Sequence, residues 1–164
     1  MKCLKIILII CTTALFINGC EKIRSYPDTP EISFKEFRYK DTVLIFSFAD
    51  GDGDIGLNSA DTLDPYNKGS QYYFNLFLTI FRQENGEFKP LDLKDSTFYR
   101  IPRVPDPKPE DQDQVRRGDI QLKMSFLPTW PDTFALRFYM VDRSLHHSDT
   151  LFVKNLTFTD YSEN

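Results

Sequence analysis

Beyond residue 30 the chain alternates between apolar and polar positions, which is the pattern of half-buried β-strands. Segment 119–127 shows the alternation most clearly, because every second residue is apolar: Ile120, Leu122, Met124 and Phe126. Successive side chains of a strand point to opposite faces, so these four side chains would all point into a core. No segment combines a helical period with helix caps, and the pattern therefore predicts a domain built from strands.

Other segments rich in β-branched and aromatic residues predict further strands. Their ranges are 32–39, 42–49, 72–81, 87–91, 97–104, 133–141 and 150–158. The first is expected to carry a register shift near Lys35–Glu36, because its apolar residues change parity there. Asn85–Gly86 predicts a hairpin turn, since both central positions of a type I′ turn need a positive φ.

Seven or eight strands with turn signals between them are typical of an all-β, antiparallel β-sandwich. We therefore predict one sandwich domain over residues 31–164. A closed barrel is the alternative, and neither the periodicity nor the length separates the two.

The first 19 residues have a different pattern. Lys2 and Lys5 precede an apolar run over 6–17, which is shorter than the roughly 20 residues of a membrane-spanning helix and fits a secretory signal peptide. The run ends in the segment 15–20, Leu-Phe-Ile-Asn-Gly-Cys, which resembles a bacterial lipobox. That resemblance implies that residues 1–19 are removed and that Cys20 carries lipid. An ordinary signal peptide with an incidental Cys20 is the alternative.

Removal of residues 1–19 changes the composition. Two of the three cysteines and two lysines are lost, so Cys20 is the only remaining cysteine and the formal net charge falls from -4 to -6. This excludes an intrachain disulfide, a cysteine-based zinc site and a catalytic thiol. The polar segment 20–30, with Pro27 and Pro30, predicts a tether between the lipid and the domain. An acidic chain is also a poor partner for nucleic acid.

An acidic, glycine-rich sequence, DGDGDIG, directly follows the strand expected at 42–49. Its carboxylates, with one more downstream, are candidate Ca²⁺ ligands: Asp50, Asp52, Asp54 and Asp61. An EF-hand is disfavoured, because Ile55 occupies the position where that loop requires glycine. Two interpretations remain open. Either these carboxylates bind Ca²⁺, or they belong to Asp-Gly turns and accept hydrogen bonds from nearby backbone N–H groups.

Surface aromatics give a second candidate site. Trp130 lies between two prolines, and with three tyrosines it would form a stacking surface for a glycan or small ligand: Tyr72, Tyr73 and Tyr99. Packing within the sandwich accounts for these residues equally well.

The adjacent histidines His146 and His147 are interpreted as part of a solvated turn. No catalytic constellation is recognisable, so we do not expect an enzyme.

Several short motifs together resemble lipoproteins of Bacteroidota-type bacteria. They are the DGDGDIGL block, Cys20, the proline-containing tether, Asn85–Gly86 and the segment 139–144, Tyr-Met-Val-Asp-Arg-Ser. With Ser148 and Thr150, that last segment also resembles the closing strands of bacterial immunoglobulin-like domains. The resemblance implies an immunoglobulin-like sandwich and a lipoprotein of the outer membrane, with no established activity. The expected function is a non-enzymatic envelope interaction module with a structural Ca²⁺, its partner an envelope protein or a glycan. The alternative is a glycan- or small-ligand-binding lipoprotein.

Overall fold

The structure is a computed structural model that describes residues 26–93, 98–105, 115–124 and 130–158. The predictions for residues 1–19 and for Cys20 lie outside these ranges. Eight strands occur in the described part: β1 (Glu31–Arg38), β2 (Val43–Asp50), β3 (Leu76–Glu84), β4 (Glu87–Pro90), β5 (Phe98–Tyr99), β6 (Arg116–Lys123), β7 (Thr133–Met140) and β8 (Leu151–Thr157). Among these residues no helix is long and apolar enough to cross a membrane.

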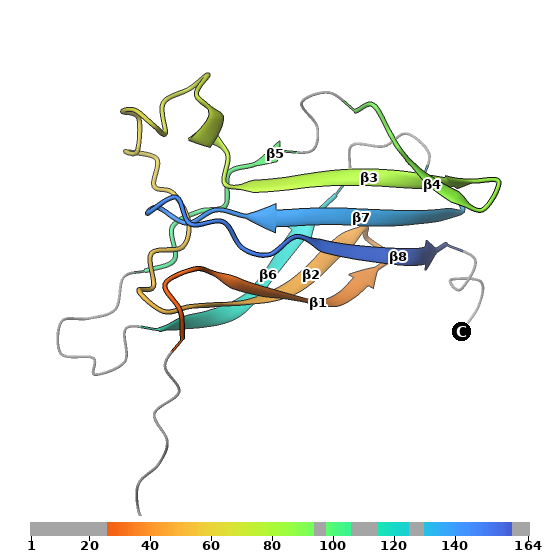
Figure 1. Ribbon diagram of the computed structural model, residues 1–164, viewed down its shortest axis with the longest axis horizontal. Coiled ribbons are helices and arrows are strands. Elements are labelled where there is room, and N and C mark those ends of the chain that lie inside the picture. The colour runs from red at the N-terminus through yellow and green to blue at the C-terminus, as the bar shows by residue number, and fades with distance from the viewer. Residues whose placement is uncertain (1–25, 94–97, 106–114, 125–129, 159–164) are drawn as a thin grey trace, which may run out of the picture.

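The strands form two antiparallel sheets that pack face to face (Figure 1). The smaller sheet has the order β1-β2-β6, and the larger has the order β4-β3-β7-β8, with β5 also paired to β3. In an immunoglobulin sandwich, strands A, B and E share one sheet, and strands C, F and G share the other. Strands β1, β2 and β6 correspond to the first set, and β3, β7 and β8 to the second. The predicted all-β, antiparallel β-sandwich is therefore confirmed, and its strand order agrees with that of the immunoglobulin-like form.

The core lies between the sheets. Phe46 of β2 and Phe138 of β7 have no exposed surface, and their ring centroids lie 5.2 Å apart across the interface. Buried residues of both sheets belong to one cluster around this pair. Burial of so many large apolar side chains is the main favourable contribution to folding.

Most predicted elements are confirmed to within a few residues. The register between β1 and β2 shifts between Phe34 and Glu36, where the sequence predicts it. Asn85 and Gly86 both have a positive φ, 51° and 83°, and they join β3 to β4. A type I′ turn needs such angles.

Two predicted strands are shorter in the structure. The strand expected at 72–81 begins only at Leu76, because Gln71–Tyr73 forms a 3₁₀ turn and the Asn75 amide binds the backbone of Ile101 through both its Nδ2 and its Oδ1. The strand expected at 97–104 is only Phe98–Tyr99 within the described residues. The chain after β5 leaves the sheet, because its backbone hydrogen-bonds to Ile55 and Leu57, which follow the carboxylates of the DGDGDIG segment.

Candidate metal centre

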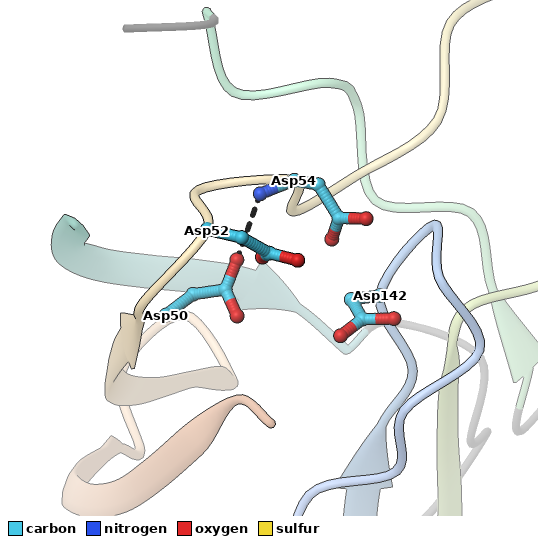
Figure 2. A group of neighbouring side chains, drawn as sticks. All are labelled: Asp50, Asp52, Asp54 and Asp142. Atoms are coloured by element: carbon cyan, nitrogen blue, oxygen red, sulfur yellow. Dashed lines mark hydrogen bonds between the residues drawn. The ribbon is translucent and has the colours of Figure 1, made fainter. Parts of the chain in front are cut away.

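Four carboxylates gather at one end of the sandwich and form what we call the acidic cluster: Asp50, Asp52, Asp54 and Asp142. One oxygen of each lies within 4.8 Å of one oxygen of every other. Figure 2 shows the four side chains pointing into the same space. Two sheets contribute to the cluster, because Asp50 ends β2 in the smaller sheet and Asp142 follows β7 in the larger.

A tight turn positions the three carboxylates of the glycine-rich loop. Gly53 and Gly56 have φ values of 71° and 87°, which residues with a side chain rarely adopt. The turn is closed by the Asp54 amide, which donates to Asp50 Oδ2 at 2.8 Å (Figure 2). The interpretation of these residues as turn formers therefore fits one oxygen of Asp50.

The other Asp50 oxygen has no such partner. Asp50 has no exposed surface, and its Oδ1 has no hydrogen-bond partner among the described residues. Asp52 Oδ1 is likewise buried and without one. Burial raises the pKa of Asp50 to about 7, and the neighbouring Asp52 carboxylate raises it as well. A buried carboxylate oxygen without a donor or a cation is strongly unfavourable when charged.

Asp142 is oriented by the loop that it begins. It is only 2% exposed, and its Oδ1 accepts from the His146 amide at 2.8 Å. Its Oδ2 lies 3.0 Å from His146 Nδ1. Burial raises the pKa of Asp142, and the Asp142 carboxylate in turn raises the pKa of His146. His146 therefore fixes the position of a cluster carboxylate, a role that the sequence did not reveal.

Asp54 closes the contact between the two loops. The Arg143 amide donates to Asp54 Oδ1 at 3.2 Å, and the Ser144 hydroxyl donates to Asp54 Oδ2 at 2.8 Å. Both donors come from the loop between β7 and β8. The glycine-rich loop after β2 and the loop between β7 and β8 are thus joined by hydrogen bonds as well as by the proximity of their carboxylates.

The structure does not bring Asp61 into the acidic cluster. Its carboxylate forms an ion pair with Arg143, with 2.6 Å between Oδ2 and Nη1, and accepts from the Asn58 amide. Asp142 takes the fourth position instead. Asp61 lies close to the glycine-rich loop in sequence, whereas Asp142 reaches the cluster only because β2 and β7 end on the same side of the sandwich.

Residues 26 and 27, which belong to the segment predicted to be a tether, lie beside the acidic cluster. The Gly51 amide, between two cluster residues, donates to Pro27 O at 2.9 Å. The Arg117 guanidinium lies over the Tyr26 ring, with 4.9 Å from its carbon to the ring centroid. Residues 26 and 27 are therefore fixed to the same end of the sandwich as the cluster.

The four aromatic candidates do not form one surface. Trp130 packs against Phe134, with 5.1 Å between ring centroids, and against further core rings at the opposite end of β7 from Asp142. Tyr99 is half-buried, and burial raises its pKa to about 12. Tyr72 and Tyr73 lie on the 3₁₀ turn, the first against His147 and the second under Arg100.

Comparison with known proteins does not assign the chain to a family or a function. No family model, curated protein or solved structure matches the chain.

The carboxylate oxygens of the acidic cluster are suitable ligands for a hard cation. Ca²⁺ takes six to eight oxygen ligands at about 2.3–2.6 Å, from carboxylates, backbone carbonyls and water. Four carboxylates that already converge, two of them with a buried oxygen lacking a donor, supply the negative charge that such an ion needs. Because Asp50 Oδ2 accepts the hydrogen bond that closes the turn and Oδ1 has no partner among the described residues, the turn and a cation would not compete for the same oxygen.

Without a cation, the protein is expected to lose stability as pH rises from about 4 to about 7, the window between the ordinary pKa of Asp50 and its raised value. In this window the folded chain binds more protons than the unfolded chain, so raising the pH favours unfolding. Urea denaturation in chelator at several pH values measures the trend. Asp50→Asn should flatten it, and a wild-type free energy of unfolding that rises across the window would contradict this account.

Proposed function

We propose that this protein is a lipid-anchored, non-enzymatic module of the cell envelope whose acidic cluster binds one structural Ca²⁺. The observation that most supports a bound cation is the state of Asp50: its side chain is fully buried, it lies in a cluster with three other carboxylates, and its Oδ1 has no hydrogen-bond donor among the described residues. A bound divalent ion would neutralise this repulsion and take up the unused oxygens.

The role is structural because of where the ligands lie. Asp50 and Asp142 come from different sheets and are both almost fully buried. An ion held by both would join the two sheets at their common end, and these two ligands would shield it from a substrate. The ion would also fix Gly51, and through it the first described residues of the tether.

The sequence alone supports the proposed lipid anchor. Cys20 ends the apolar segment that resembles a lipobox, and six residue steps separate it from Tyr26. An extended chain spans at most about 3.3–3.6 Å per residue, so lipid on Cys20 would lie within roughly 20 Å of the domain. The cation site would then lie at the end of the sandwich where the tether joins it.

Calorimetric titration of the mature, chelator-treated protein tests the cation. One Ca²⁺ per chain is expected, and Asp142→Asn should weaken binding at least tenfold. Asp61→Asn is the matched control, because it removes a nearby carboxylate that lies outside the cluster. Absence of binding at millimolar Ca²⁺ would contradict the proposal. A loss confined to Asp61→Asn would show that the ligands are wrongly assigned.

The anchor makes a separate prediction. Expressed in a bacterium that processes lipoproteins, the full chain should enter the detergent phase of a detergent–water separation, and Cys20→Ser should move it to the aqueous phase. Dual acylation is enough for stable membrane attachment, so the shift should be nearly complete. If wild type and variant partition alike, Cys20 is not the anchor.

A further inference from the structure

The outer face of the larger sheet is unusually aromatic. The outer face of an antiparallel sheet is normally polar where it meets water. Here Leu76, Leu78 and Ile80 of β3 point into the core, so the residues between them point outward. Together with neighbouring strands they form what we call the outer aromatic face: Phe77, Phe81, Phe88, Phe98, Tyr139 and Phe152.

The rings form two groups on either side of a polar row. Phe77 stacks on Tyr139 with 5.0 Å between centroids, and Phe98 lies edge-on to Phe77. Further along the strands, Phe152 packs on Phe81 at 5.1 Å. Between the groups, Thr79 of β3 pairs with Arg137 of β7.

A shallow depression of about 330 Å³ lies at the first group. Rings line it together with hydrogen-bonding side chains: Phe77, Phe98, Tyr139, Thr79, Arg137 and Thr150. Phe98 is 38% exposed, so part of its ring is available to a ligand.

The charge of this face is opposite to that of the whole chain. The Arg137 guanidinium carbon lies 5.1 Å from the centre of the Phe81 ring, and Lys154 Nζ lies 4.8 Å from that of Phe152. Strands β7 and β8 contain no acidic residue, and the only one in β3, Glu84, pairs with Arg82 and Lys89. Strand β4 contains Glu87, whose register partner is Glu84. The chain as a whole has a net charge of -4.

We propose that the outer aromatic face binds an anionic polysaccharide, with uronic acid residues as the recognised unit. The apolar C–H face of a sugar ring packs on the aromatic rings, its carboxylate pairs with the guanidinium of Arg137, and its hydroxyls bond to Thr79 and Thr150. An apolar protein partner fits less well, because it would strip water from Arg137 and Lys154 without pairing them. A hydroxyl-rich anion pairs these cations and leaves them partly hydrated.

Binding of a galacturonic acid hexasaccharide to the mature protein tests this proposal. The titration is run in chelator, so that Ca²⁺ cannot bridge the sugar to the acidic cluster and the result is independent of the cation site. Arg137→Gln and Phe98→Ala should each weaken binding at least tenfold. Lys40→Gln is the control, because Lys40 is exposed, lies outside the larger sheet and changes the net charge equally. Circular dichroism and melting temperature verify that each variant folds.

Two comparison ligands complete the design. A neutral glucose hexasaccharide should bind at least tenfold more weakly than the acidic one, and so should a hexaglutamate peptide, which has the charge without the sugar rings. The proposal is overturned if the acidic sugar fails to bind at millimolar concentration, if Arg137→Gln binds it as wild type does, or if the peptide binds equally well. Self-association through this face, detected as a concentration-dependent mass that Phe98→Ala abolishes, would also overturn it.

Discussion

Millimolar Ca²⁺ is expected to raise the melting temperature of the chelator-treated protein by about 8 °C. A ligand at one hundred times its dissociation constant stabilises the folded state by about 2.7 kcal/mol. For a chain of this size, each kcal/mol shifts the melting temperature by roughly 3 °C. The shift arises because the ion removes the repulsion among four carboxylates, of which Asp50 and Asp142 are almost fully buried.

Substitutions in the cluster should separate this effect from general stabilisation by salt. Asp50→Asn and Asp142→Asn should abolish most of the shift. In chelator at neutral pH, Asp50→Asn should melt above wild type, because it removes a buried charge whose pKa is raised to about 7. Asp132→Asn, at an exposed aspartate at the opposite end of β7, should respond to Ca²⁺ as wild type does. Equal shifts in all variants would mean that the ion acts elsewhere.

Phe138→Ala is expected to destabilise the fold by about 3–5 kcal/mol, the usual range for removing a buried phenylalanine ring. Phe138 has no exposed surface and contacts Phe46 of the opposite sheet, so its loss leaves a cavity between the sheets. Urea denaturation measures the change. Leu63→Ala is the control, because the Leu63 side chain is 80% exposed and should change the free energy of unfolding by less than about 0.5 kcal/mol. A loss below about 1 kcal/mol at Phe138 would contradict the packing described here.

The sequence predicts the strands well wherever one face meets the core. Strand β6 is an example, because Leu122 in it and Met124 directly after it are both buried, as the alternation requires. The hairpin at Asn85–Gly86 is equally predictable, since its backbone angles depend on those two residues alone. Segment 72–81 is harder. Its apolar residues have both parities, because one set fills the core and the other forms the outer aromatic face. The pattern also does not show that Gln71–Tyr73 forms a 3₁₀ turn or that the Asn75 side chain binds the backbone of Ile101.

The candidate metal centre is only half predictable for a related reason. Asp50, Asp52 and Asp54 share one short loop, so their spacing reveals that they converge. Asp142 is 88 residues further along the chain than Asp54 and joins them only through the pairing of strands into two sheets. Asp61 is the nearest remaining acidic residue in sequence, but Arg143 holds its carboxylate in an ion pair.

A crystal structure of residues 20–164 grown with Ca²⁺ tests the central claim most directly. The account predicts one ion in the acidic cluster, with oxygens of Asp50, Asp52, Asp54 and Asp142 as ligands at about 2.3–2.6 Å. Anomalous scattering at long wavelength identifies the ion as calcium. A fully ordered cluster with water or a lysine in that space, or a calcium ion held by other residues, would contradict it.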